Sequence, residues 1–116
     1  MNIEQLRKFC LSFPHVTEDV KWGNDLCFCV GKKMFAVTGL ESNDGGVSFK
    51  CTPEKFAELV EKEGIIPAPY VARYHWVAVE KPDIIAESEL KDLISNSYQM
   101  VFEKLLAKIR KSLESK

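Results

Sequence analysis

Two cysteines stand two residues apart in an apolar stretch of the chain. Cys27 and Cys29 flank Phe28, and alternate residues of a strand share one face of its sheet. A zinc site would need further ligands at finger or ribbon spacing, and neither Cys10 nor Cys51 supplies a second close pair. The sequence therefore predicts no metal site, and we expect four reduced thiols that fill small spaces in the packing.

Histidine is the usual base that activates a cysteine or serine nucleophile. The chain has two histidines, His15 and His75, and neither lies beside a nucleophile elbow or a phosphate-binding loop. The sequence therefore predicts no catalytic residue, no cofactor and no enzymatic activity.

The sequence also contains residues that could bind a ligand, namely cations close to aromatic rings. Lys32 and Lys33 follow a glycine that suits a hairpin tip, and Lys50 lies further along. The run from Arg73 to Trp76 follows a segment stiffened by prolines. Cations contact phosphates, and aromatic rings stack on bases. The candidate nucleic-acid-binding residues are Lys32, Lys33, Lys50, Arg73, Tyr74, His75 and Trp76.

Each candidate also has a structural interpretation. Tryptophans such as Trp22 and Trp76 commonly anchor a core, and lysines at a hairpin tip are commonly solvated. Tyr70 and Tyr74 can fold back over a sheet. The basic run that begins at Lys104 suits the negative end of a helix dipole.

A three-stranded meander is expected to position these residues. Its strands are Leu26–Val30, Met34–Thr38 and Val47–Cys51, which are rich in aromatic and β-branched residues. The two-residue loop Gly31-Lys32 suits a type II′ turn. This loop length places Val30 opposite Lys33.

The predicted register sorts the side chains of the meander into two faces. Phe28 then pairs with Phe35, and Leu26 with Val37, on a face that helices should cover. The other face is small and soft, with Cys27, Cys29, Met34, Ala36 and Thr38. We expect the Pro67–Tyr74 loop, the end of the long helix or a second copy of the chain to cover it. The alternative to nucleic-acid binding is that this face is a protein-interaction or self-association surface, for a protein partner or a homodimer.

Helices and one more strand are expected around the meander. Asn2 and Gln5 can form a capping box for a helix that Pro14 ends, and residues 15–23 are expected to be a solvated loop. Thr52 and Pro53 start a second helix that Gly64 stops. A loop over 65–74, a strand over 75–79 and a helix from Ser88 to about residue 111 complete the order α-βββ-α-β-α. The expected fold class is α+β, a two-layer α/β arrangement with an antiparallel sheet.

Size and composition limit the function further. The 116 residues suit one domain over 1–116. The formal net charge of −1 predicts no strong overall electrostatic field. It weighs against a protein whose binding depends mainly on phosphate contacts. No apolar run is long enough for a membrane span, and no signal peptide is expected, so we expect a cytoplasmic protein.

Three segments also carry a family pattern. The first runs from Pro14 to Asp25, the second from Gly31 through Pro53-Glu54, and the third joins His75-Trp76 to Ser97-Tyr98. Together they resemble the MmcQ/YjbR family of small bacterial α/β proteins, over nearly the whole chain. The resemblance implies an antiparallel two-layer fold, similar in outline to secretion-chaperone-like folds, and weak, non-specific DNA binding, the role commonly given to the family.

One position departs from the family pattern. Many relatives resemble Asn-Lys-x-His-Trp before the histidine, whereas this chain has Ala72-Arg73-Tyr74-His75-Trp76. The amide is lost and the cation survives as Arg73.

Overall fold

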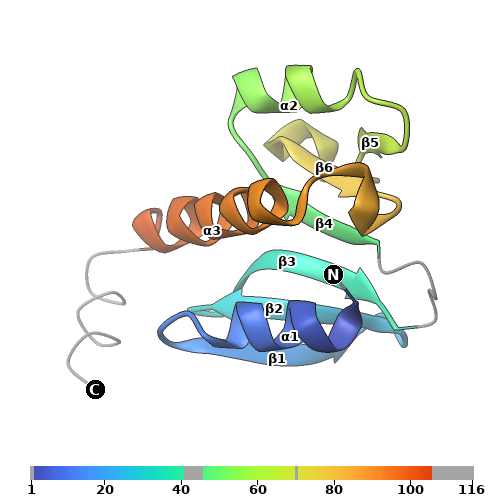
Figure 1. Ribbon diagram of the computed structural model, residues 1–116. Coiled ribbons are helices and arrows are strands. Elements are labelled where there is room, and N and C mark those ends of the chain that lie inside the picture. Colours follow the sequence, from blue (N-terminus) through green and yellow to red (C-terminus); the bar gives the residue numbers. More distant parts are fainter. Residues whose placement is uncertain (1, 41–45, 70, 106–116) are drawn as a thin grey trace.

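A six-stranded antiparallel sheet, with three α-helices on one face, organises the molecule (Figure 1). The computed structural model describes residues 2–40, 46–69 and 71–105. The strand order is β1-β2-β3-β4-β6-β5. In chain order the elements are α1 (Ile3–Leu11), β1 (Val16–Lys21), β2 (Asp25–Val30), β3 (Lys33–Gly39), β4 (Val47–Lys50), α2 (Pro53–Leu59), β5 (Ile65–Pro67), the 3₁₀ turn η1 (Ala72–Tyr74), β6 (Trp76–Val79), the 3₁₀ turn η2 (Pro82–Ile84) and α3 (Glu87–Glu103).

The α+β class with an antiparallel sheet is confirmed, but the sheet has two strands that were predicted as loops. The segment predicted as a solvated connector forms β1, which pairs with β2 from Val16↔Val30 to Lys21↔Asp25. β5 pairs with β6 at the opposite edge. Both are edge strands, and an edge strand carries charges or proline because one side faces water. In the described residues no helix is long and apolar enough to cross a membrane.

The β2–β3 hairpin corrects two predictions. Gly31 and Lys32 both have positive φ, 56° and 67°, which is the type I′ turn rather than type II′. Cys29 faces Met34, but the register then shifts, so that Phe28 faces Ala36. β3 therefore contains a β-bulge, which inserts one extra residue into the ladder.

Beyond the bulge, the residues of β3 lie on the opposite sheet face from the one predicted for them. Phe28 and Phe35 are both fully buried in the core, as predicted, but they are not cross-strand partners. Ala36 and Thr38 lie opposite Phe28 and Leu26, and so on the helix-covered face. Their predicted place on the open face, and that of Val37 on the covered face, were wrong.

α3 packs over a gap between β3 and β4 in the middle of the sheet, which we call the seam. β3 and β4 pair only from Ala36↔Phe49 to Thr38↔Val47, and the strands part beyond them. The buried Ser97 hydroxyl of α3 fills this gap. It donates a hydrogen bond to the Phe35 carbonyl oxygen at 2.6 Å and accepts one from the Lys50 amide at 3.0 Å. Figure 1 shows α3 running along the seam between the two halves of the sheet.

The residue after the seam serine ties α3 to the N-terminal part of the chain. Tyr98 donates a hydrogen bond from its hydroxyl to the Pro14 carbonyl oxygen at 2.8 Å. Its ring stacks on Phe13, with the centroids 4.7 Å apart. Both residues of the Ser97-Tyr98 pair therefore have structural partners that account for their presence.

The predicted helix starts are confirmed for two helices and wrong for the third. Asn2 and Gln5 form the capping box of α1, and the Thr52 side chain caps α2 ahead of Pro53. α2 ends at Leu59, before Gly64, whose φ of 90° instead leads into β5. For α3 the N-cap is Ala86, and Ser88 already lies inside the helix. α3 ends at Glu103 with Lys104 as its C-cap, so the prediction that the helix includes Leu105 was wrong. The predicted continuation over 106–111 lies outside the described residues.

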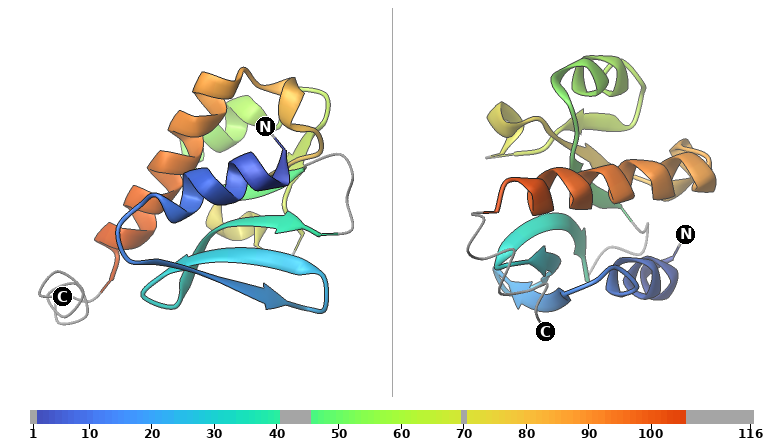
Figure 2. Two further views of the ribbon diagram at one scale, coloured as in Figure 1. Left: turned by 60° about the horizontal axis from the view of Figure 1, so that its bottom comes forward. Right: turned by 90° about the vertical axis from the view of Figure 1, so that its left-hand side faces the viewer.

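All three helices pack on the same side of the sheet. Figure 2 shows α3 between the half that contains β1–β3 and the half that contains β5, β6 and α2. Apolar side chains of the helices, such as Leu6, Leu59 and Leu90, join those of the sheet in one core. Among the described residues the opposite sheet face carries only η1 and the end of α3, and the candidate site lies there.

Candidate functional site

Strand register defines the floor of the open face. Cys27 pairs with Val37, Val37 with Ser48, and Ser48 with Ala78. Paired residues share a face, so these four form a row across the strands, and Ile66 of β5 continues it. The row is apolar or small throughout, as the sequence predicted for this face.

The open face is hollowed into a groove with two arms. The first, the basic arm, has a volume of about 640 Å³. The strand ends, η1 and the end of α3 surround it. Its lining residues are Gly31, Lys33, Met34, Lys50, Val71, Tyr74, Trp76, Val101, Lys104 and Leu105.

The second arm, the apolar arm, has a volume of about 650 Å³. It is lined by Trp22, Asp25, Met34, Val37, Ser48, Ala68, Pro69, Val71 and Trp76. Met34, Val71 and Trp76 line both arms, so the two arms adjoin at these residues. Part of the Pro67–Tyr74 loop forms a wall of both arms, and Tyr70 lies outside the described residues.

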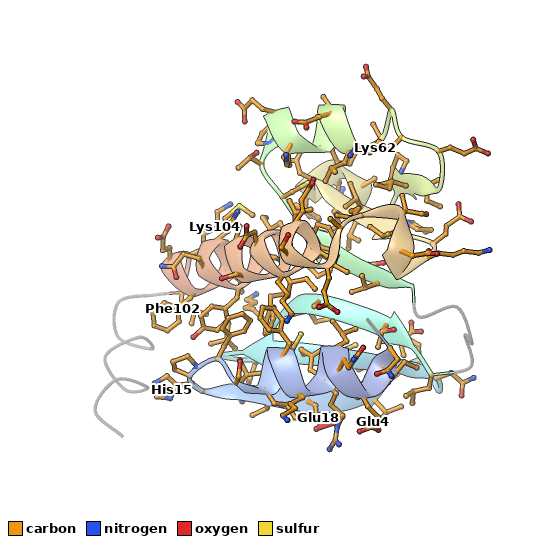
Figure 3. All side chains as sticks on the ribbon, in the orientation of Figure 1. Glu4, His15, Glu18, Lys62, Phe102 and Lys104 are labelled. Carbon is orange, nitrogen blue, oxygen red and sulfur yellow. The ribbon has the colours of Figure 1, made fainter. Side chains whose placement is uncertain are left out.

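Three lysines converge on the basic arm. Lys33 comes from β3, Lys50 from β4 and Lys104 from the end of α3. Among the described residues, no carboxylate lines this arm. Figure 3 shows Lys104 and Phe102 on opposite sides of the end of α3. Burial and the neighbouring Lys104 ammonium both lower the pKa of Lys50. A site that lowers the pKa of a lysine favours a bound anion, because the anion stabilises the protonated amine.

An aromatic ring and a guanidinium stand at the rim of this arm. The Tyr74 side chain is 49% exposed. The Arg73 guanidinium carbon lies 4.9 Å from the centre of the Tyr74 ring, a cation–π distance. Arg73 thus holds one face of the ring and adds a positive charge beside the groove.

The predicted site residues separate into three sets. Lys33, Lys50, Tyr74 and Trp76 line the basic arm, and Lys32 and Arg73 are exposed next to two of them. His75 does not join them, because its ring packs edge-on against Phe56 of α2, with the centroids 5.7 Å apart. Its backbone carbonyl accepts hydrogen bonds from Cys51.

Two residues of the groove were missed as site residues. Lys104 was explained only by a favourable interaction with the helix dipole, because the apolar pattern predicted that the helix continues beyond this residue. Trp22 was expected to be an anchor but is 71% exposed, while Trp76 is indeed buried. Trp22 lies in the β1–β2 turn with a positive φ of 53°. This turn was not predicted because β1 was not predicted as a strand.

The cysteines offer little reactivity. All four are buried, and none forms a disulfide. Burial raises the pKa of Cys10 to about 12 and that of Cys27 and Cys51 to about 11, so the thiols stay protonated at neutral pH. The described residues contain no cluster of three or more histidine, cysteine or acidic side chains that could hold a metal ion.

Comparisons with known proteins place this geometry in a family. The YjbR family model matches residues 11–100. The uncharacterized protein YjbR of Escherichia coli K12 is 28% identical, over 97% of this chain and 98% of that protein.

Solved structures agree. A crystal structure of a Deinococcus radiodurans protein with a DUF419 domain is 28% identical, with a TM-score of 0.89, over 97% of this chain and 88% of that one. A Pseudomonas syringae protein, 23% identical over 87% of this chain and 99% of that one, shares the fold with a TM-score of 0.69. From the match to the family model over most of its length, the chain belongs to the YjbR family.

Proposed function

We propose that this protein is a small non-enzymatic module that binds nucleic acid through the basic arm of the groove. The observation that carries the proposal is the convergence of Lys33, Lys50 and Lys104 around one hollow, which no carboxylate lines in the part of the chain that the structure describes. Local clustering matters here because the net charge of the chain is only −1 and supplies no general attraction to phosphate.

The expected binding is weak and depends on salt. Three phosphate contacts give a slope of log K against log salt of roughly −3 on duplex DNA. Fluorescence anisotropy with a labelled duplex, from low to moderate salt, measures both the affinity and the slope. No binding of this duplex or of a single strand at low salt with micromolar protein would refute the proposal.

Matched lysine variants test the location of the site. Lys104→Ala is expected to weaken binding to every sequence alike and to reduce the slope by about one unit. Lys62→Ala removes the same charge from an exposed residue on the α2 side of the molecule (Figure 3), and is expected to leave the slope unchanged. Equal effects of the two variants would mean that only overall charge matters.

The alternative function, a protein-interaction or self-association surface, has less support. Cys27 and Cys29 are buried, and Ala36 and Thr38 lie on the helix-covered face. Of the residues expected to form the exposed surface, only Met34 lines the groove.

A further inference from the structure

The two arms of the groove differ in chemistry although they share a floor. The basic arm carries three lysines, and the apolar arm carries none. Among the described residues, Asp25 is the one charged side chain that lines the apolar arm, and it repels phosphate. An occupant of the whole groove must therefore be anionic at one end and apolar and flat at the other.

Exposed aromatic rings mark both arms. Trp22 is 71% exposed at the apolar arm, and Tyr74 is 49% exposed at the basic arm. Exposed aromatic rings are the platforms on which proteins stack the bases of single strands. Between them lies a floor of small and apolar side chains, among them Met34 and Val37.

We infer that the groove takes single-stranded nucleic acid, with the backbone at the lysines and an unpaired base in the apolar arm against Trp22. This inference rests on the proposed function and adds the form of the nucleic acid. In a duplex the bases are stacked and paired, so a duplex offers only phosphates to such a groove. A single strand offers both a phosphate and the face of a base, and stacking on aromatic rings is the usual way in which proteins hold it.

The apolar arm is large enough for this role. Its volume of about 650 Å³ falls within the range of small-molecule sites, about 300–1,000 Å³. It adjoins the basic arm at Met34, Val71 and Trp76, so a phosphate at the lysines and its neighbouring base face adjacent hollows.

The test compares three oligonucleotides at equal phosphate concentration: a thymine single strand, a strand of the same length with abasic sites, and a duplex. Wild-type protein is expected to bind the thymine strand at least about tenfold more tightly than the other two at the same salt. Equal binding of all three would overturn this inference and leave the proposed function standing. Absence of binding to all three would refute both.

Variants then locate the base. Trp22→Ala is expected to weaken binding of the thymine strand by about 5- to 100-fold and to leave abasic binding and the salt slope unchanged. The exposure of Trp22 makes the substitution safe for the fold. Leu11→Ala, which removes an exposed apolar side chain from α1 on the opposite side of the sheet, is the matched control and is expected to bind as wild type.

Two results would contradict the assignment of the base site. One is a Trp22→Ala protein that binds the thymine strand as tightly as wild type. The other is competition by a poly-glutamate peptide as effective as that of the oligonucleotide, since this would assign the groove to an acidic protein segment.

Discussion

Removal of the Ser97 hydroxyl tests how the sheet is held together. This hydroxyl joins the Phe35 carbonyl to the Lys50 amide across the seam, at 2.6 and 3.0 Å. Ser97→Ala leaves a buried acceptor and an amide donor without this partner. Each unsatisfied buried group costs about 1–3 kcal/mol, and the better helix propensity of alanine returns at most about 0.5 kcal/mol. For the two groups together we expect a net loss of about 1.5–5.5 kcal/mol in the free energy of unfolding.

Urea denaturation measures this loss as a lower midpoint at an unchanged slope. Ser95→Ala is the matched control, because Ser95 lies on the same helix, two residues away, and is only partly buried. It is expected to change stability by less than about 0.5 kcal/mol. Amide exchange adds a local readout, since the Lys50 amide is expected to exchange faster in Ser97→Ala. A loss no larger than that of the control, with unchanged exchange at Lys50, would refute the bridging role.

Three further measurements address the core, the thiols and the groove. Phe28→Ala is expected to cost about 3–5 kcal/mol in denaturation experiments, because Phe28 is fully buried; a cost below about 1 kcal/mol would contradict its place in the core. The pKa of Cys10 is raised to about 12 from an ordinary 9.0, so the folded state keeps a proton that the unfolded state loses. Stability is therefore expected to fall between pH 9 and 12, by up to about 1.4 kcal/mol per pH unit for this thiol, and Cys10→Ala should fall less steeply. Lys104→Ala removes a positive neighbour, so the lowered pKa of Lys50 should rise towards its ordinary value in an NMR titration; an unchanged pKa would show that burial alone lowers it.

The sequence predicted the elements whose apolar pattern is strong. The meander, the capping box at Asn2 and the start of α2 at Thr52 all follow from local residue types and are confirmed. β1 was missed because an edge strand is stabilised by its neighbour rather than by its own apolar residues. The strand has no such pattern, although it pairs with β2 along its whole length.

The errors in the site have the same origin. A bulge cannot be read from alternation alone, because the residue that it inserts looks like any other member of the strand. Placement of Ala36 and Val37 therefore needed the register shift next to Cys29. Lys104 reaches the groove only because the end of α3 packs beside β4 and η1, which is a tertiary relation that local patterns do not contain.

The seam between β3 and β4 also divides the chain so that each half of the sheet comes from one continuous part of the sequence. Residues 2–40 contain α1 and the β1-β2-β3 half of the sheet, and residues 46–105 contain β4, β5, β6, α2 and α3. A cut between Leu40 and Gly46 would therefore separate the molecule into two contiguous fragments without dividing any of the described helices or strands. Because the groove floor crosses the seam from Val37 to Ser48, the binding site would exist only when the fragments reassociate, which makes this fold a natural starting point for a split-protein reporter.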